Sequence, residues 1–176
     1  VAVAYEEAYA YMWGDCVRTK GAVTASLRLT EMAADYAGKG MTGLEALQAL
    51  YEKYGWYGEK TFNLVMPGLD GLADMARLMK SLREAPPAQI AGVDVVQFQD
   101  YLDGSVVDLA TGGKTAMELS GSNVLRFELA DGTSIIVRPS GTEPKIKVYI
   151  LTKGADAAER DANVAKYGAW VDTLKK

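Results

Sequence analysis

A series of short β-prone segments in the second half of the chain constrains its fold more than any other feature. Residues 93–99, 124–129, 134–138 and 145–151 each have the length and the apolar, β-branched content of a strand. Asp131-Gly132, which separates the second segment from the third, is typical of a hairpin turn. Consecutive strands joined by short turns predict an antiparallel sheet.

Helices are expected on both sides of this strand series. Residues 69–83 and 155–174 carry apolar residues at helical spacing, and residues 56–66 have an extended pattern. The resulting order is strand, helix, four strands, helix. We therefore expect an α+β fold with a mainly antiparallel sheet of four or five strands and helices on one sheet face.

The first 55 residues have a different pattern. Residues 1–5 are typical of the end of a buried strand, which suggests a cut inside a larger protein. Helices follow over residues 22–37 and from Thr42, where Thr42 and Glu45 have the spacing of a capping box. We expect the apolar faces of both helices to pack in a core. Because one strand and two helices are too few for an independent core, we expect residues 1–55 to be the helical tail of an α/β domain and residues 56–176 to be a second domain.

Composition excludes several classes of function. With one cysteine, Cys16, and no histidine, the chain holds no internal disulfide, no Ser-His-Asp or Cys-His catalytic set and no structural zinc site. The formal charge of −4 argues against a nucleic-acid partner. No apolar run approaches the roughly 20 residues of a membrane span, and no signal-peptide pattern opens the chain. We expect a cytoplasmic protein without a membrane partner.

The segment Arg138-Pro-Ser-Gly-Thr-Glu-Pro144 carries the clearest chemistry. Prolines at both ends stiffen the loop, and Gly141 permits a positive φ at which successive N–H groups converge on an anion. Ser140 and Thr142 add hydroxyl donors, and the Arg138 guanidinium suits bidentate contact with phosphate. Lys145 adds positive charge, with Lys147 on the same face of the next strand. The loop predicts a site for a phosphate group.

This loop resembles the C-terminal phosphate-binding loop of the α-D-phosphohexomutases, the phosphoglucomutase/phosphomannomutase family. Residues 88–101, 122–127 and 131–133 resemble the strand and hairpin that precede that loop in the family. The resemblance implies that residues 56–176 are the fourth, phosphate-binding domain, with a TATA-box-binding-protein-like fold. It also implies that residues 1–55 end the third, sugar-binding domain.

Two segments near the N-terminus resemble substrate-contacting parts of the family. Residues 5–11 resemble its sugar-binding loop, in which Glu6 lines up with the sugar-contacting glutamate and Glu7 is the adjacent acid. Two positions depart from the family pattern: Ala8 stands where many members have Ser, and Ala10 where most have Gly. A further segment, residues 15–23, places Arg18 and Lys20 as possible substrate-proximal cations, with an equal alternative of plain surface charge.

The resemblance implies an intramolecular phosphotransferase that interconverts hexose 1-phosphate and hexose 6-phosphate through a phosphoserine and a bisphosphorylated intermediate. The family's serine loop and its Mg²⁺-binding aspartate loop have no match in this sequence. We therefore expect no catalytic residue and no metal ligand in this chain, which alone should be inactive. Its partners would be the phosphosugar and the upstream domains. Arg138, Ser140, Gly141 and Thr142 would hold the phosphate, and Glu6 would bind the sugar. A phosphopentomutase and a non-catalytic phosphate-binding or interaction module remain alternatives.

Overall fold

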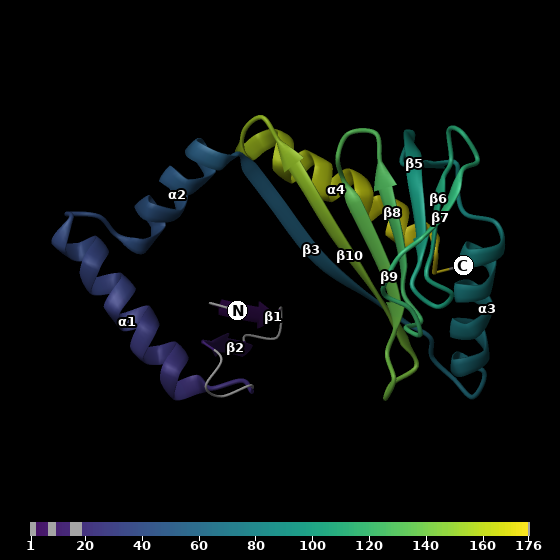
Figure 1. Ribbon diagram of the computed structural model, residues 1–176, viewed down its shortest axis with the longest axis horizontal. Helices are drawn as coiled ribbons and strands as arrows, with labels where there is room; N and C mark the ends of the chain where they lie inside the picture. Colours follow the sequence, from purple (N-terminus) through teal and green to yellow (C-terminus); the bar gives the residue numbers. More distant parts are fainter. Residues whose placement is uncertain (1–2, 7–9, 15–18, 176) are drawn as a thin grey trace. The chain divides into compact units, whose positions relative to one another are not determined.

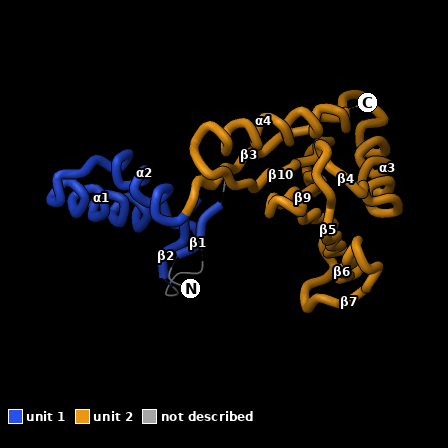
Figure 2. The backbone as a smooth tube through the Cα atoms, turned by 90° about the horizontal axis from the view of Figure 1, so that it is seen from above, with its two compact units in different colours: residues 1–54 blue, residues 55–176 orange. Residues whose placement is uncertain are grey.

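The computed structural model describes residues 3–6, 10–14 and 19–175. The chain divides into two compact units, residues 1–54 and 55–176, which are coloured separately in Figure 2.

The second unit is built on one antiparallel sheet (Figure 1). The strands follow one another in the sheet as β3-β10-β9-β8-β5-β6-β7, and β4 pairs with β5 beside this path. Every pairing described in the sheet is antiparallel. The strands are β3 (Trp56–Val65), β4 (Gln89–Ile90), β5 (Val93–Asp100), β6 (Ser105–Asp108), β7 (Lys114–Ala116), β8 (Leu125–Leu129), β9 (Ser134–Pro139) and β10 (Lys145–Gly154).

Two helices, α3 (Gly71–Glu84) and α4 (Ala157–Thr173), cover one face of this sheet. Met79 and Leu82 of α3 and Tyr167 and Val171 of α4 belong to one buried cluster with the inward side chains of the strands. Within β10, residues alternate between buried and more exposed positions, so its helix-covered face carries Ile146, Val148 and Ile150. The α+β fold class and the placement of the helices are as expected.

The sheet has more strands than the four or five expected. The sequence predictions for residues 93–99, 124–129, 134–138 and 145–151 correspond to β5, β8, β9 and β10. The additional strands β4, β6 and β7 are two to four residues long and lie among glycines and turns. Such short segments show no period from which a strand can be predicted.

Polar contacts at the β8–β9 turn fix the last helix to the sheet. The Tyr167 hydroxyl donates to the Asp131 carboxylate, which also accepts the Thr133 N–H at 3.0 Å. Beneath the turn, the buried Thr133 and Thr152 hydroxyls lie 2.8 Å apart. The expected Asp131-Gly132 hairpin turn is therefore also a junction between the sheet and α4.

The first unit consists of a hairpin and two helices. The hairpin pairs β1 (Val3–Glu6) with β2 (Ala10–Trp13), and α1 (Ala22–Gly38) and α2 (Gly43–Tyr54) follow. The expected capping box is confirmed: the Glu45 carboxylate accepts the Thr42 N–H at 2.7 Å, and the Thr42 hydroxyl accepts the Glu45 N–H at 3.2 Å.

Two predictions for this unit were wrong. The opening strand was expected to be buried, but Val3 and Tyr5 are exposed, because β1 has only β2 as its described partner. The helix faces were expected to pack in a core, but α1 has no buried residue among those described and α2 has only Ala46. Leu29, Met32 and Leu47 are therefore exposed. The assignment of residues 1–55 to an α/β domain remains a prediction.

None of the helices that the structure describes combines the length and the hydropathy needed to cross a bilayer.

Candidate functional site

The predicted phosphate loop lies between β9 and β10, two neighbouring inner strands of the sheet. The ladder between these strands runs up to Pro139 and Ile146, and the Ser140 N–H then donates to the Lys145 carbonyl at 2.8 Å. The loop is thus a short connection closed at its base by backbone pairing. Residues 141–144 are exposed, so the loop presents its backbone and hydroxyls to solvent.

Two cationic residues lie opposite one another where these strands reach the loop. Arg138 of β9 is paired in register with Lys147 of β10, so both side chains project from the face that the helices leave open. Arg138 is exposed and makes no hydrogen bond or ion pair with any residue that the structure describes. Like charges directly opposite on a sheet are unfavourable. A dianion bound between the strands would be attracted by both positive charges.

The loop backbone differs from the expected anion nest. Gly141 does not have a positive φ, and the Ser140 N–H is already bonded to Lys145. The Thr142 N–H is directed at the Ser140 hydroxyl oxygen, 3.4 Å away. The prediction that successive N–H groups converge was therefore wrong for this conformation, because the loop uses two of those donors to close on itself. The Ser140 and Thr142 hydroxyls remain as donors for a ligand.

Space is available at the centre of the loop. A Cβ atom built on Gly141 would meet no atom within 4 Å. A phosphate group could therefore approach the backbone at this residue without displacing protein atoms.

Lys145, the first residue of β10, is half-buried and forms an ion pair. Its Nζ lies 2.6 Å from the Glu143 carboxylate, within the same connection. Glu143 is exposed, with a side chain 58% accessible, so the ion pair can exchange for a contact with an anion. The structure thus places Lys145 beside the loop, with its charge already paired.

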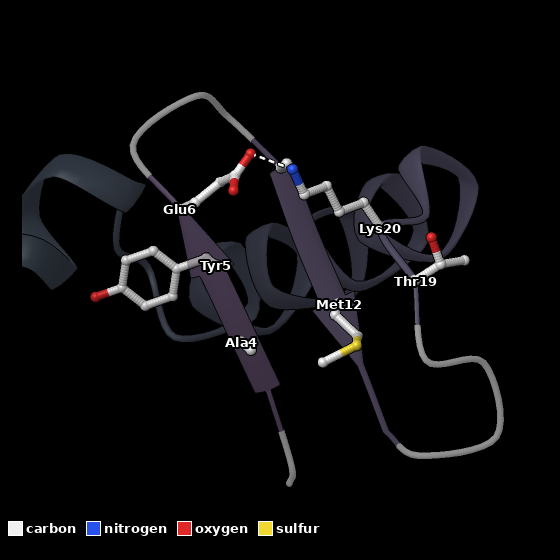
Figure 3. Close-up of a pocket in the computed structure, with 7 residues that line it drawn as sticks. Ala4, Tyr5, Glu6, Met12, Thr19 and Lys20 are labelled. Carbon is white, nitrogen blue, oxygen red and sulfur yellow. Dashed lines mark hydrogen bonds and ion pairs between the residues drawn. The ribbon is translucent and has the colours of Figure 1, made fainter. Parts of the chain in front are cut away.

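The second predicted site lies in the first unit. Figure 3 shows Glu6, at the end of β1, directed toward Lys20, which precedes α1, and the two form an ion pair. They border an open pocket of about 340 Å³. Both side chains keep substantial exposure, 40% for Glu6 and 62% for Lys20. The pair brings together Glu6, predicted to bind the sugar, and Lys20, predicted as a possible substrate-proximal cation. The other residues lining the pocket are Ala4, Tyr5, Ala10, Met12 and Thr19.

Glu7 and Arg18, the other residues of the first unit predicted near the substrate, lie outside the described residues, as does Ala8.

Sequence reasoning missed two contributions to the phosphate loop. The opposition of Lys147 to Arg138 follows from the register of β9 on β10, and the period of two on either side of the loop is the signal that could have revealed it. The Met66 N–H donates to the Pro144 carbonyl at 2.8 Å. That bond joins the end of β3 to the loop across a large sequence separation, and no local pattern signals it.

A divalent metal does not fit the described side chains. Among residues 3–6, 10–14 and 19–175, no group of three or more Asp, Glu, Cys or His side chains could hold a metal ion.

The chain is similar to known proteins over most of its length. A family model described as phosphoglucomutase/phosphomannomutase, C-terminal domain, matches residues 63–165. A phosphoglucomutase of Staphylococcus aureus (strain N315) is 34% identical over 153 residues, which cover 87% of this chain and 28% of that protein. A probable phosphomannomutase of Haemophilus influenzae is 32% identical over 164 residues, covering 93% of this chain and 30% of the relative. The chain thus spans less than a third of the length of these relatives.

A solved structure has the same fold. It is the exocytosis-sensitive phosphoprotein pp63/parafusin of Paramecium, a phosphoglucomutase in an open form. The TM-score is 0.59 at 18% identity, over 98% of this chain and 30% of that one. The family match covers the end of β3, the other strands of the sheet, the loop and about half of α4. The chain therefore belongs to the phosphoglucomutase/phosphomannomutase family.

Proposed function

We propose that the connection between β9 and β10 binds the phosphate group of a phosphosugar. The observation that carries the proposal is the exposed Arg138, which has no partner among the described residues and lies opposite Lys147. The Ser140 and Thr142 hydroxyls and the open space at Gly141 lie in the same short loop. A guanidinium supplies parallel N–H donors, and hydrogen bonds to a charged group contribute about 1.5–3 kcal/mol each.

The sugar contact is proposed for Glu6. A carboxylate accepts hydrogen bonds from two neighbouring hydroxyls and so distinguishes their stereochemistry. The Lys20 ion pair holds the Glu6 side chain at the pocket of the first unit, and a sugar would compete with the lysine for the carboxylate.

In a longer, cytoplasmic protein, this chain would serve an intramolecular phosphotransferase. A phosphoserine would pass its phosphoryl group to the free hydroxyl of a hexose phosphate, and the other phosphoryl group of the bisphosphate would return to the serine. The relatives named phosphoglucomutase and phosphomannomutase support this reaction class. The serine and the Mg²⁺ ligands would lie outside these 176 residues. The present residues would bind and orient substrate, and the chain alone would be inactive.

An amide NMR titration tests the phosphate site directly. Glucose 1-phosphate added to the 176-residue chain should shift the amides of residues 140–142 saturably, with a Kd on the order of 1 mM. Arg138→Ala should abolish the shifts. Arg77→Ala is the matched control: it removes an exposed arginine of α3 that pairs with Asp74, and it should bind like the unmodified chain.

Each outcome decides a point. Saturable shifts lost only in Arg138→Ala support the phosphate site. Equal loss in both arginine variants would point to general charge attraction and contradict it. No shift at tens of millimolar ligand in the unmodified chain would also contradict it. In the longer protein, hexose and pentose phosphates compared as substrates decide between a hexomutase and a phosphopentomutase.

A further inference from the structure

We propose that Gly71, the first residue of α3, is a positioning residue for the phosphate loop. The proposal rests on phosphate binding by that loop and concerns how the loop is held in place. Gly71 lies outside the loop in sequence and is buried. Its role is to leave room for the backbone that supports Pro144.

The steric evidence is the lack of room for a side chain at position 71. A Cβ atom on Gly71 would lie 2.2 Å from the Met66 carbonyl oxygen and 3.1 Å from the Met66 carbonyl carbon. It would also lie 3.2 Å from Cβ of Pro144. Real Cβ contacts do not fall below 3.0 Å, so any side chain at position 71 has to displace α3, the backbone at Met66, or both.

Met66 connects this contact to the loop. Its N–H donates to the Pro144 carbonyl at 2.8 Å, while its own carbonyl is the atom against Gly71. On the other side of the connection, Ser140 donates to the carbonyl of Lys145, the residue after Pro144. The C-terminal end of the loop is therefore held from two directions, by β9 and by the segment that joins β3 to α3.

Space, and not backbone conformation, explains the glycine. Gly71 does not have a positive φ, so an L-residue could adopt its backbone angles. Elsewhere in the unit, Gly154 is a close match: its Cβ would lie 2.3 Å from the Arg160 backbone nitrogen, and its φ is likewise not positive. Gly154 ends β10, whereas the loop precedes the start of that strand. Both glycines therefore leave no room for a Cβ atom. Gly71 does so beside Pro144, just before the start of β10, and Gly154 does so at the end of that strand.

The pair of variants Gly71→Ala and Gly154→Ala separates positioning from general stability. Both should lower the melting temperature of the chain. In amide NMR titrations with glucose 1-phosphate, Gly71→Ala should raise the Kd about tenfold or more, because ångström-scale misplacement of binding groups has effects of this size. Gly154→Ala should keep the Kd of the unmodified chain.

Equal Kd values for Gly71→Ala and the unmodified chain would overturn the proposal. So would an equal rise in both variants, since the effect would then be global. If the unmodified chain does not bind glucose 1-phosphate, the proposed function itself is contradicted. If the unmodified chain binds it and Arg138→Ala does not, the proposed function stands, and the Kd of Gly71→Ala alone decides the role of Gly71.

A measurement on the unmodified chain keeps the inference testable if Gly71→Ala fails to fold. Because coupling between sites is reciprocal, a ligand that depends on the Met66–Pro144 bond must also stabilise that bond. Saturating glucose 1-phosphate should slow hydrogen exchange of the Met66 amide. The Leu174 amide, which donates to Val171 at the end of α4, should not slow by the same factor. Unchanged exchange at Met66 would contradict the proposal.

Discussion

An alanine at position 141 is expected to leave the fold intact and to weaken phosphate binding. Gly141 has no positive φ, and its Cβ would contact nothing within 4 Å. The melting temperature should therefore change little, since surface substitutions without such contacts stay within about 0.5 kcal/mol. A methyl group in the space proposed for phosphate should raise the Kd severalfold. Thermal unfolding and the glucose 1-phosphate titration measure the two effects, and an unchanged Kd would place the phosphate elsewhere.

Removing the charge of Glu143 should strengthen phosphate binding. Glu143→Gln frees the Lys145 ammonium from a contact of 2.6 Å and removes a negative charge from the loop. Exposed ion pairs are worth about 0–1 kcal/mol, so the Kd should fall by up to about fivefold. The gain should shrink at high salt. A double variant with Lys145→Gln is the control, and an equal gain there would show that Lys145 takes no part.

Ionisation of Tyr167 should lower the stability of the folded chain at alkaline pH. Burial, and after it the hydrogen bond to the Asp131 carboxylate, raise the pKa of Tyr167 to about 12 from 10.0. The unfolded chain then loses its tyrosine proton before the folded chain does. This contribution to stability is complete below pH 10 and disappears as the pH rises to 12, by roughly 2–3 kcal/mol.

Tyr167→Phe is the control for this pH dependence. The variant should be less stable at pH 8, because it loses a hydrogen bond to a carboxylate. The difference in unfolding free energy between variant and unmodified chain should shrink between pH 10 and pH 12. Urea unfolding at several pH values measures it. Parallel curves over that range would show that Tyr167 ionises equally in both states.

Among the elements, α2 offers a test of a local signal. Thr42→Ala removes the hydroxyl that accepts the Glu45 N–H and should increase fraying of the first turn about fivefold. Hydrogen bonds from the Thr42 N–H and then from its hydroxyl lower the pKa of Glu45. The cap is therefore strongest above pH 4.5 and weakens as the pH falls through the lowered value. Hydrogen exchange of the Ala46 amide measures fraying. Thr42→Ser should behave like the unmodified chain, and equal fraying in the serine and alanine variants would contradict the cap.

Elements with a strong local pattern could be predicted from the sequence. The capping box at Thr42, the turn at Asp131-Gly132 and the alternation that buries Ile146 beside Lys147 depend on neighbours within a few residues. These features rest on helical or strand period, which a single sequence displays directly.

The features that the sequence did not reveal depend on contacts between residues distant in sequence. Whether the faces of α1 and α2 are covered depends on neighbouring elements, which helical period does not reveal. The anion-binding nest expected at Gly141 does not form, because the Ser140 N–H donates to the Lys145 carbonyl. The contact of Gly71 with Met66 required the folded turn between β3 and α3. For the site, the sequence supplied the residue types of the loop, and the fold supplied the opposition of Arg138 to Lys147.

At the scale of the whole molecule, residues 55–176 should fold without the first unit. The buried cluster runs from Leu64 to Val171 and includes none of the described residues of the first unit. A shortened chain of residues 55–176 should keep the amide chemical shifts of β5, β8, β9 and β10 and should unfold cooperatively. NMR spectra and urea unfolding check this. A collapsed spectrum without shift dispersion would show that the first unit is needed for folding.

The sheet order also has a consequence for synthesis. The first strand of the second unit, β3, pairs with the last one, β10, and the register joins Trp56 to Gly154. A ribosome adds about 5–20 residues per second. β10 is therefore synthesised on the order of ten seconds after β3, and until then β3 lacks this neighbouring strand. During that time Leu64, fully buried in the finished fold, has no strand beside it. Chaperones that bind extended apolar segments would find β3 available in the nascent chain, and this edge of the sheet forms only after residues 145–154 have been synthesised.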